Sequence, residues 1–160
     1  MIKIYDKTFA KINNSLFKSK ILNYTKENPC CYGYPNCNCP KHQSNAHLHH
    51  AIPELRESLY NALDKCKLNC EITHMWSFVT FNNQEVDSIN HNHQVSNNKE
   101  YTGLLYLTKT DIGTVFDDEV ITPKINTWYI WDSKLYHRPN NGITEKNRIV
   151  ISTGLKDLEH

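Results

Sequence analysis

The sequence has no long hydrophobic run and no excess of charge of either sign. No apolar stretch reaches the roughly 18 residues that a membrane-spanning helix needs. The formal net charge is +1, which disfavours partners attracted by charge alone, such as nucleic acid or an anionic membrane surface. The N-terminal residues MIKIYD carry both acidic and basic side chains, unlike the apolar centre of a secretory signal peptide. We therefore expect a cytoplasmic protein with no membrane partner.

Internal repeats and long linkers are also absent, so we expect a single domain. The length of 160 residues suits one ordinary domain, and 39% hydrophobic with 22% charged residues is typical of a globular protein. We expect this domain, over residues 1–157, to consist of a helical part at 1–69 and a β-rich part at 70–157. Residues 158–160 look like the start of a cloning tag and are excluded.

The helical part shows two segments with helical periodicity. Apolar residues from Phe9 to Tyr24 recur on one helical face, and Pro29 would end that helix. A second helix is expected to begin at Pro53, a favourable first-turn position. Its buried stripe would consist of Leu55, Leu59, Ala62 and Cys66. Residues 29–50 have neither helical nor strand periodicity, which indicates a loop.

From residue 70 onward the pattern changes to short strands separated by polar turns. Residues 70–82 alternate as a strand. One face of it would carry Ile72, His74, Trp76 and Phe78. Further strands are expected at 88–95, 101–109, 113–117, 126–132 and 146–154. Many short strands with polar turns indicate a sandwich or barrel, so the fold class should be mainly β with N-terminal helices covering one face.

Three histidines form a candidate metal site. His91 and His93 are two residues apart in an expected strand, and a period of two places both imidazoles on the same face. Such a pair can chelate one metal ion, and His137 is the natural candidate for a third ligand. Imidazole ligands suit iron and other divalent transition metals. The two-residue spacing alone is a weak signal, and it gains weight only with the third histidine.

Arg148 is the candidate for binding an anion. It begins an apolar strand in which Arg148, Val150 and Ser152 share one face. A lone guanidinium that points into a barrel is an unpaired buried charge unless an anion meets it. A co-substrate with a carboxylate could do so through a bidentate pair.

With these motifs, residues 72–154 resemble the 2-oxoglutarate- and iron(II)-dependent oxygenases, especially the short ones of phages and bacteria. The matching segments are Met75-Trp76, His91-Asn92-His93, Gly103–Leu107, Gly113–Phe116, Trp128–Trp131, His137 and Arg148–Ser152. The resemblance implies a double-stranded β-helix, a jelly roll of cupin-like type. It also implies that iron(II), 2-oxoglutarate and O2 hydroxylate a substrate and release succinate and CO2.

The resemblance also implies roles for individual residues. His91, His93 and His137 would hold the iron, and Arg148, eleven residues after His137, would bind the far carboxylate of 2-oxoglutarate. Assistance to that carboxylate could come from Tyr101, Tyr106 or Ser152.

The position of His93 departs from the family pattern, which has an aspartate or glutamate there. A site of three histidines carries one more unit of positive charge than the usual two histidines and carboxylate. Alternatively, Asp87, Glu100 or Asp117 could supply a carboxylate from nearby.

The loop at 29–50 is a second candidate metal site. In a cytoplasmic protein the six cysteines are expected to be thiols or metal ligands. A structural zinc could be held by Cys30, Cys37, Cys39 and His42. The spacing does not match a zinc finger, and a solvent-exposed or substrate-capping loop with reduced thiols is the alternative.

Two other functions stay open at this point. One is a cupin-like iron dioxygenase that uses three histidines and no 2-oxoglutarate, which His93 favours and the spacing from His137 to Arg148 disfavours. The other is a non-catalytic metal-binding or sensing module centred on the cysteine-rich loop. The three tryptophans, Trp76, Trp128 and Trp131, are expected in the core, although one could line a pocket. The substrate, whether a small molecule or a peptide, and the oligomeric state are not predicted.

Overall fold

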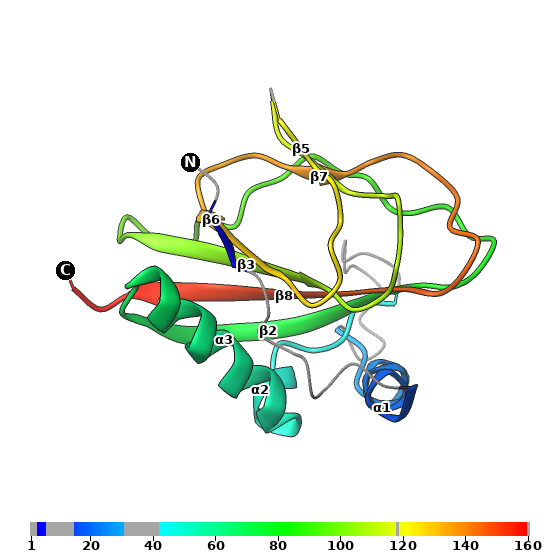
Figure 1. Cartoon of the computed structure of the whole chain (residues 1–160), viewed down its shortest axis with the longest axis horizontal. Helices are drawn as coiled ribbons and strands as arrows, with labels where there is room; N and C mark the ends of the chain where they lie inside the picture. The colour runs from blue at the N-terminus through cyan, green and yellow to red at the C-terminus, as the bar shows by residue number, and fades with distance from the viewer. Residues whose placement is uncertain (1–2, 6–14, 31–41, 118, 160) are drawn as a thin grey trace.

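The computed structural model describes residues 3–5, 15–30, 42–117 and 119–159 (Figure 1). Its helices are α1 (Ser15–Glu27), α2 (Leu48–Ala51) and α3 (Pro53–Cys66). Its strands are β1 (Lys3–Tyr5), β2 (Cys70–Thr80), β3 (Glu100–Tyr106), β4 (Thr114–Val115), β5 (Val120–Ile121), β6 (Trp128–Asp132), β7 (Arg138–Pro139) and β8 (Arg148–Asp157). None of the described helices is long and apolar enough to cross a membrane.

The strands form two antiparallel sheets. The larger has the order β1-β6-β3-β8-β2 and the smaller the order β5-β4-β7. Helices α2 and α3 lie on one side of the larger sheet, whereas β5 and β7 lie on the other (Figure 1). The prediction of a mainly β jelly roll with N-terminal helices is confirmed.

Alternation along the central strands β3, β6 and β8 of the larger sheet divides the core into two clusters. The helix-facing cluster joins Leu55, Leu59, Ala62 and Leu63 of α3 to Met75, Leu105, Trp128, Ile130 and Ile151 of the sheet. The cluster between the sheets contains Tyr106, Phe116, Ile121, Tyr129, Trp131 and Val150. The expected stripe of α3 is confirmed except at Cys66, which is only partly buried. Trp128 ties helix to sheet, since its indole N–H donates to Ser58 Oγ at 3.0 Å.

The strand expected at 88–95 is wrong as a continuous strand. This segment makes one isolated bridge, His91 with His137, and a second bridge, Glu85 with Ile143, lies just before it. The strand that follows its bridge partner His137, β7, is two residues long and contains Pro139, which has no N–H to donate. The segment nevertheless lies beside residues 137–143 and takes the place of a fourth strand in the smaller sheet.

One expected face of strand β2 is wrong. A β-bulge between Ile72 and His74 shifts the register against β8. Ile72 therefore packs in the helix-facing cluster and not on the expected shared face, whereas His74, Trp76 and Phe78 lie together on the other face. A bulge reverses the alternation at one point, and period-two reasoning cannot locate it.

Candidate metal centre and pocket

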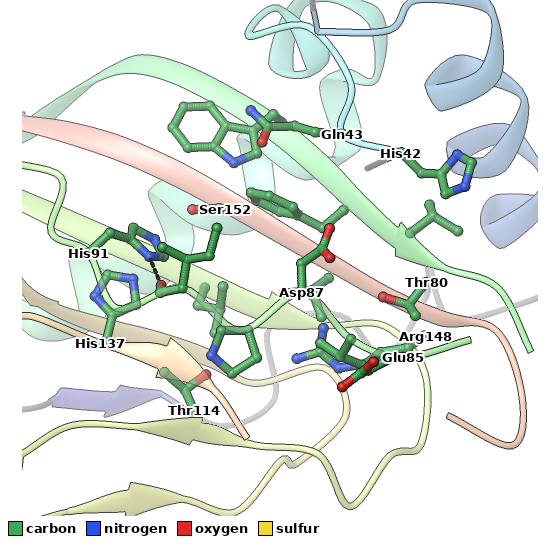
Figure 2. Close-up of a pocket in the computed structure, with 18 of the residues that line it drawn as sticks. His42, Gln43, Thr80, Glu85, Asp87, His91, Thr114, His137, Arg148 and Ser152 are labelled. Carbon is green, nitrogen blue, oxygen red and sulfur yellow. Dashed lines mark hydrogen bonds between the residues drawn. The ribbon is translucent and has the colours of Figure 1, made fainter. Parts of the chain in front are cut away.

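A pocket of about 580 Å³ lies between the two sheets. The larger sheet contributes Trp76, Phe78, Leu104, Arg148, Val150 and Ser152 to its walls. The smaller sheet and the neighbouring segment contribute Glu85, Val86, Asp87, Ile89, His91, His93, Thr114, His137 and Pro139. Gln43 and His42 line its edge (Figure 2). The three histidines and Arg148 thus line one cavity, although they come from distant parts of the sequence.

Backbone hydrogen bonds place the three histidines together. His91 and His137 exchange N–H···O=C bonds of 3.0 and 2.8 Å. The His93 N–H donates to the Ser133 carbonyl at 3.1 Å. The segment carrying His91 and His93 is therefore in register with the chain that leads into β7.

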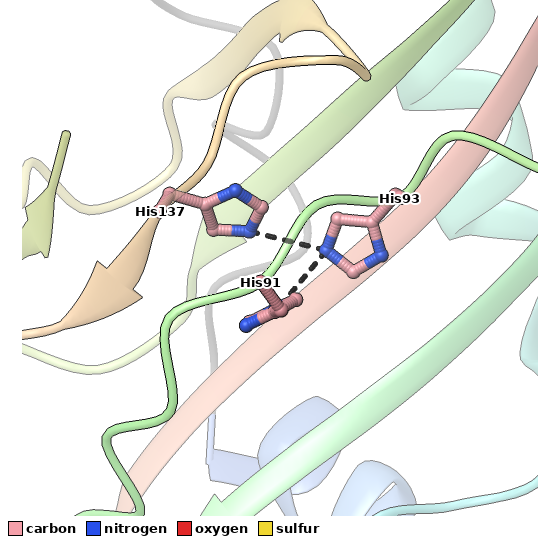
Figure 3. Close-up of side chains that lie close together, drawn as sticks. All are labelled: His91, His93 and His137. Carbon is pink, nitrogen blue, oxygen red and sulfur yellow. Dashed lines mark hydrogen bonds between the residues drawn. The ribbon is translucent and has the colours of Figure 1, made fainter. Parts of the chain in front are cut away.

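The imidazole rings converge on one point (Figure 3). The Nε2 atom of His93 lies 3.1 Å from Nε2 of His91 and 3.1 Å from Nε2 of His137. On the far side of the rings, Nδ1 of His91 is 2.6 Å from the Ile89 carbonyl and Nδ1 of His137 is 3.1 Å from that of Leu135. A carbonyl only accepts, so these Nδ1 atoms carry the proton and the Nε2 lone pairs face the centre.

This donor set fits a transition-metal ion. Metal–nitrogen bonds of about 2.1 Å place two ligand atoms about 3.1 Å apart when they subtend about 95°. Imidazole nitrogens suit iron, nickel, copper and zinc, whereas magnesium and calcium prefer oxygen. The histidines are also the only group of three potential ligands that converge in the described part of the chain.

Among the described residues, no carboxylate joins the histidine cluster. Glu100 accepts hydrogen bonds from the Val95 N–H at 2.9 Å and from Ser96 Oγ at 2.8 Å, so it orders the turn before β3. Asp117 is exposed beyond β4, and Asp87 lines the pocket outside the cluster. The described residues therefore present a three-histidine centre.

Burial keeps the imidazoles of His93 and His137 neutral at pH 7. Desolvation, reinforced by the neighbouring imidazoles, lowers the pKa of His93 to about 3. The same two causes lower the pKa of His137 to about 4. Neutral imidazole is the form that binds a metal, so protons do not compete for these two residues near neutral pH.

Aromatic rings surround the histidines. Trp131 meets the His137 ring edge-on at a centroid distance of 5.1 Å, and Phe116 lies 5.7 Å from it. Trp76 lies 5.9 Å from the His93 ring and stacks on His74 at 4.4 Å. Trp128 and Trp131 belong to the core as expected, whereas Trp76 lines the pocket.

Arg148 is a buried charge at the opposite end of the pocket from the histidines (Figure 2). Its side chain is 4% exposed. One Nη2–H bonds the Ile112 carbonyl at 3.4 Å, Nε has no hydrogen-bond partner, and no described carboxylate lies within 4.0 Å. Desolvation lowers the pKa of this guanidinium. A buried guanidinium with an unused N–H has the chemistry to bind an anion.

Of the three other residues expected near Arg148, Ser152 lines the pocket, Tyr106 lies beside the guanidinium and Tyr101 faces away. Ser152 lines the pocket, two residues along the same face of β8. The Tyr106 ring centroid is 5.8 Å from the Arg148 guanidinium, but its hydroxyl is hydrogen-bonded to Thr114 Oγ1, and Thr114 lines the pocket. Tyr101 packs against the helix-facing cluster and therefore lies on the wrong side of the sheet.

The proposed zinc site cannot be placed as a whole. Cys37 and Cys39 lie outside the described residues. Cys30 Sγ accepts a hydrogen bond from Gln43 Nε2 at 3.6 Å, and the His42 ring meets Phe81 edge-on at 4.7 Å. Sequence reasoning did not identify Gln43, Thr114, Glu85 or Phe78 as pocket residues. Only Phe78 had a usable signal, its two-residue spacing from Trp76.

Comparison with known proteins identifies the fold. No protein-family model and no curated protein sequence matches the chain. Among solved structures, it is similar to a viral collagen prolyl hydroxylase of Paramecium bursaria Chlorella virus-1 in complex with 2-oxoglutarate. The TM-score is 0.64 at 11% identity, and the match covers 99% of this chain and 96% of the viral one.

A second similar structure is HygX from Streptomyces hygroscopicus with nickel and 2-oxoglutarate bound. The TM-score is 0.65 at 10% identity, and the match covers 99% of this chain and 82% of HygX. HygX with nickel, 2-oxoglutarate and hygromycin B gives the same TM-score and identity, covering 99% of this chain and 83% of HygX. The resemblance seen in the sequence is thus confirmed at the level of the fold, the double-stranded β-helix.

Proposed function

We propose that this chain is a 2-oxoglutarate- and iron(II)-dependent oxygenase that hydroxylates a small molecule or a peptide. The observation that carries the proposal is the presence, in one pocket, of three converging imidazoles and a buried guanidinium that no carboxylate of the described residues contacts. The similar structures support it, because the viral hydroxylase binds 2-oxoglutarate and HygX binds iron, nickel and 2-oxoglutarate.

Each polar residue of the pocket then has a role. His91, His93 and His137 would hold iron(II), which together with 2-oxoglutarate and O2 supplies the oxidising chemistry and yields succinate and CO2. Arg148 would bind the far carboxylate of 2-oxoglutarate, and hydroxyls would be offered by Ser152 of the same strand, β8, and by Thr114 of β4 in the other sheet.

The burial of Arg148 makes it selective for an anion. Its charge is desolvated before the ligand arrives, so an incoming carboxylate restores the lost solvation and adds a charge-assisted hydrogen bond to the unused Nε–H. The apolar side chains beside it, Leu104 and Val150, exclude water and strengthen that interaction.

A second function is favoured by one observation, the absence of a carboxylate from the histidine cluster in the described residues. An iron dioxygenase of cupin type holds its metal with three histidines and needs no 2-oxoglutarate. It leaves the buried guanidinium of Arg148 without a role.

The test is a spectroscopic titration without oxygen. Iron(II) and then 2-oxoglutarate are added to metal-free protein, and the visible charge-transfer band of a chelated iron–keto-acid complex is recorded. We expect the band in the wild type, its loss in His137→Ala and a weakening of at least tenfold in 2-oxoglutarate affinity in Arg148→Ala. His50→Ala and Arg56→Ala remove exposed residues of the same types from α2 and α3 and should leave the band unchanged.

The other outcomes contradict the proposal in distinguishable ways. Bound iron without a band, whatever the 2-oxoglutarate concentration, would favour the cupin-type dioxygenase. Protein that binds no iron would favour a non-catalytic metal module.

A further inference from the structure

We propose that the substrate is a peptide in extended conformation, which pairs as an antiparallel strand with the free backbone edge at Asn90, His91 and Asn92 and inserts one side chain into the pocket. The inference rests on the proposed function and assigns a substrate class to the same pocket. Its evidence is the backbone groups beside the metal centre, the side chains of that segment and the protection of other strand edges.

The segment that carries His91 is bonded to the smaller sheet along one side only. His91 and His137 exchange backbone hydrogen bonds of 3.0 and 2.8 Å, so both backbone polar groups of His91 point towards the chain that leads into β7. In an antiparallel pair, the N–H and C=O groups of the residues before and after such a position point the opposite way. Asn90 and Asn92 therefore present their backbone groups on the open side, and neither residue makes a hydrogen bond with the described part of the chain.

Alternation along the segment places this open edge at the metal centre. Ile89, His91 and His93 line the pocket, whereas Asn90 and Asn92 between them do not. The imidazoles of His91 and His93 project from the segment towards each other (Figure 3). A strand that pairs with Asn90 and Asn92 has one residue directly opposite His91, with the two Cα atoms about 4.5 Å apart and both side chains on the same face. That side chain of the peptide therefore enters the pocket beside the proposed metal ligands.

The side chains of this edge favour pairing with a further strand. Residues 88–98 read SINHNHQVSNN and contain no lysine, arginine, aspartate, glutamate, proline or glycine. Exposed sheet edges are normally protected by charges or prolines, because unpaired N–H and C=O groups otherwise attract another strand. Ile89 is 65% exposed and lines the pocket, so it is available as an apolar cross-strand neighbour. The edge thus lacks protection against pairing where it borders the pocket.

Two other strand edges are covered or protected. Residues 42–46 cover the outer edge of β2, where the Ser44 N–H donates to the Ser77 carbonyl at 2.9 Å. At the far end of the smaller sheet, β5 is two residues long and is flanked by Glu119 and Pro123. A charge and a proline beside a short strand disfavour pairing with another chain. The fold protects these edges and leaves open the edge that borders the metal centre.

A peptide uses these features, whereas a free metabolite does not. Backbone hydrogen bonds to Asn90 and Asn92 would provide affinity without reading a sequence, and the side chain opposite His91 would provide selectivity inside the pocket. A small molecule that fills the pocket alone makes no contact with the open edge, so its affinity would not depend on the N–H groups of that edge.

The experiment measures binding to protein loaded with iron(II) and 2-oxoglutarate without oxygen. The probes are pools of acetylated, amidated heptapeptides with one fixed central residue and mixed flanking residues, and the acetylated amide of each central residue alone. A ligand that binds the native state raises the melting temperature. We expect at least one pool to raise it, and a single peptide selected from that pool to bind at least about tenfold more tightly than its blocked central residue.

Methylation of single amide nitrogens in the selected peptide tests the pairing on the wild-type protein. The two residues that flank the central one direct their N–H groups to the edge, so methylation of either should weaken binding by about tenfold or more. The N–H of the central residue points away from the edge, and its methylation is the matched control, which should change the affinity by less than about threefold.

Variants test the same contact from the side of the protein. Asn92→Pro removes an N–H that donates to no described residue, and a residue before proline keeps the extended conformation that the bridge at His91 requires. This variant should bind the selected peptide about tenfold or more weakly and keep the charge-transfer band of the iron–2-oxoglutarate complex. Asn92→Ala retains the backbone N–H and should bind the peptide as the wild type does.

The other outcomes overturn the inference in distinguishable ways. With the band present, pools that raise the melting temperature no more than their blocked central residues overturn the peptide and leave the oxygenase proposal standing. A wild-type dimer that Asn92→Pro converts to monomers in sedimentation would mean that the edge pairs with a second copy of the chain, which also overturns the peptide. A missing band overturns the oxygenase proposal and, with it, the substrate role of any peptide that binds.

Discussion

The guanidinium of Arg148 is a charge that the fold buries before any ligand arrives. We predict that Arg148→Met stabilises the ligand-free protein by about 1–3 kcal/mol, because an apolar side chain of similar length removes the desolvation cost of an unpaired buried charge. Urea denaturation without metal or 2-oxoglutarate measures the change. Arg56→Met, an exposed control on α3, should stay within about 0.5 kcal/mol of the wild type.

The opposite result would assign Arg148 a structural role. If Arg148→Met unfolds more easily than the wild type, the hydrogen bond to the Ile112 carbonyl outweighs the buried charge. The same variant should lose the upward shift in melting temperature that 2-oxoglutarate gives the metal-loaded wild type, since a ligand that no longer binds cannot stabilise the native state.

As a proposed metal ligand, the side chain at position 93 should set the preference for a metal. Carboxylate ligands suit manganese, whereas imidazole suits nickel and copper. We predict that His93→Asp shifts the ratio of nickel to manganese affinity towards manganese by on the order of tenfold, about 1.4 kcal/mol. Competition titrations of the two ions measure the ratio. An unchanged ratio would mean that His93 is not a ligand, whatever its distance from His91 and His137.

At the scale of single elements, strands β2 and β8 approach each other closely where Gly154 of β8 faces His74 of β2. A Cβ atom on Gly154 would lie 2.1 Å from Cε1 of His74, the ring that stacks on Trp76. We predict that Gly154→Ala destabilises the protein by about 1–3 kcal/mol through overpacking.

A double-mutant cycle tests whether the His74 ring causes the loss of stability in Gly154→Ala. In a His74→Ala background the clash disappears, so Gly154→Ala should cost less than about 0.5 kcal/mol there. Urea denaturation of the four proteins measures the coupling. If Gly154→Ala costs the same in both backgrounds, the backbone of β8 rather than the ring of His74 requires glycine.

Regular central strands were the elements that sequence could predict best. Strand β8 lies between β3 and β2 and pairs along its length with both, so its alternation is uninterrupted and Arg148, Val150 and Ser152 share the expected face. The expected convergence of His91, His93 and His137 is present in the structure, whereas their role as metal ligands stays a prediction. The stated basis of that convergence, a regular strand at 88–95, was wrong, and the backbone bonds to residues 133 and 137 align the rings instead.

Features that depend on distant partners could not be predicted. Strand β1 has three residues and exists because it pairs with β6, more than a hundred positions away. Strands β5 and β7 have two residues each, and β4 is their common neighbour. Such short segments carry no period, because two or three residues cannot show alternation. The walls of the pocket at Gln43 and Glu85 depend on the same long-range placement.

At the scale of the whole molecule, buried histidines couple folding to pH. Desolvation lowers the pKa of His93 to about 3 and those of His49 and His137 to about 4, and it also lowers the pKa of His74. The unfolded chain binds protons near the ordinary value of 6.5, so between pH 6.5 and 4 it holds more protons than the native state.

We predict that the metal-free protein loses stability as pH falls from 6.5 towards 4 and changes little from these groups above 6.5. Each proton taken up on unfolding contributes a slope of about 1.4 kcal/mol per pH unit. Urea denaturation at pH 7.5, 6.5, 5.5 and 5.0 should give at least one proton of uptake below 6.5. Constant stability from pH 7.5 to 5.0 would show that the imidazoles are hydrated in the native state.

The two ends of the metal centre are far apart along the chain. His93 and His137 are separated by 44 residues, yet their Nε2 atoms lie 3.1 Å apart. In polymer terms, closing a loop of that length in a flexible chain costs about 4 kcal/mol. The folded sheets have already closed this loop, so a metal ion that reaches the folded protein meets a preformed set of ligands. An unfolded chain would bind the ion about a thousandfold more weakly. The affinity for metal therefore depends on how completely the two sheets are assembled. A substitution that loosens β7 from its neighbour should lower this affinity even when all three histidines remain.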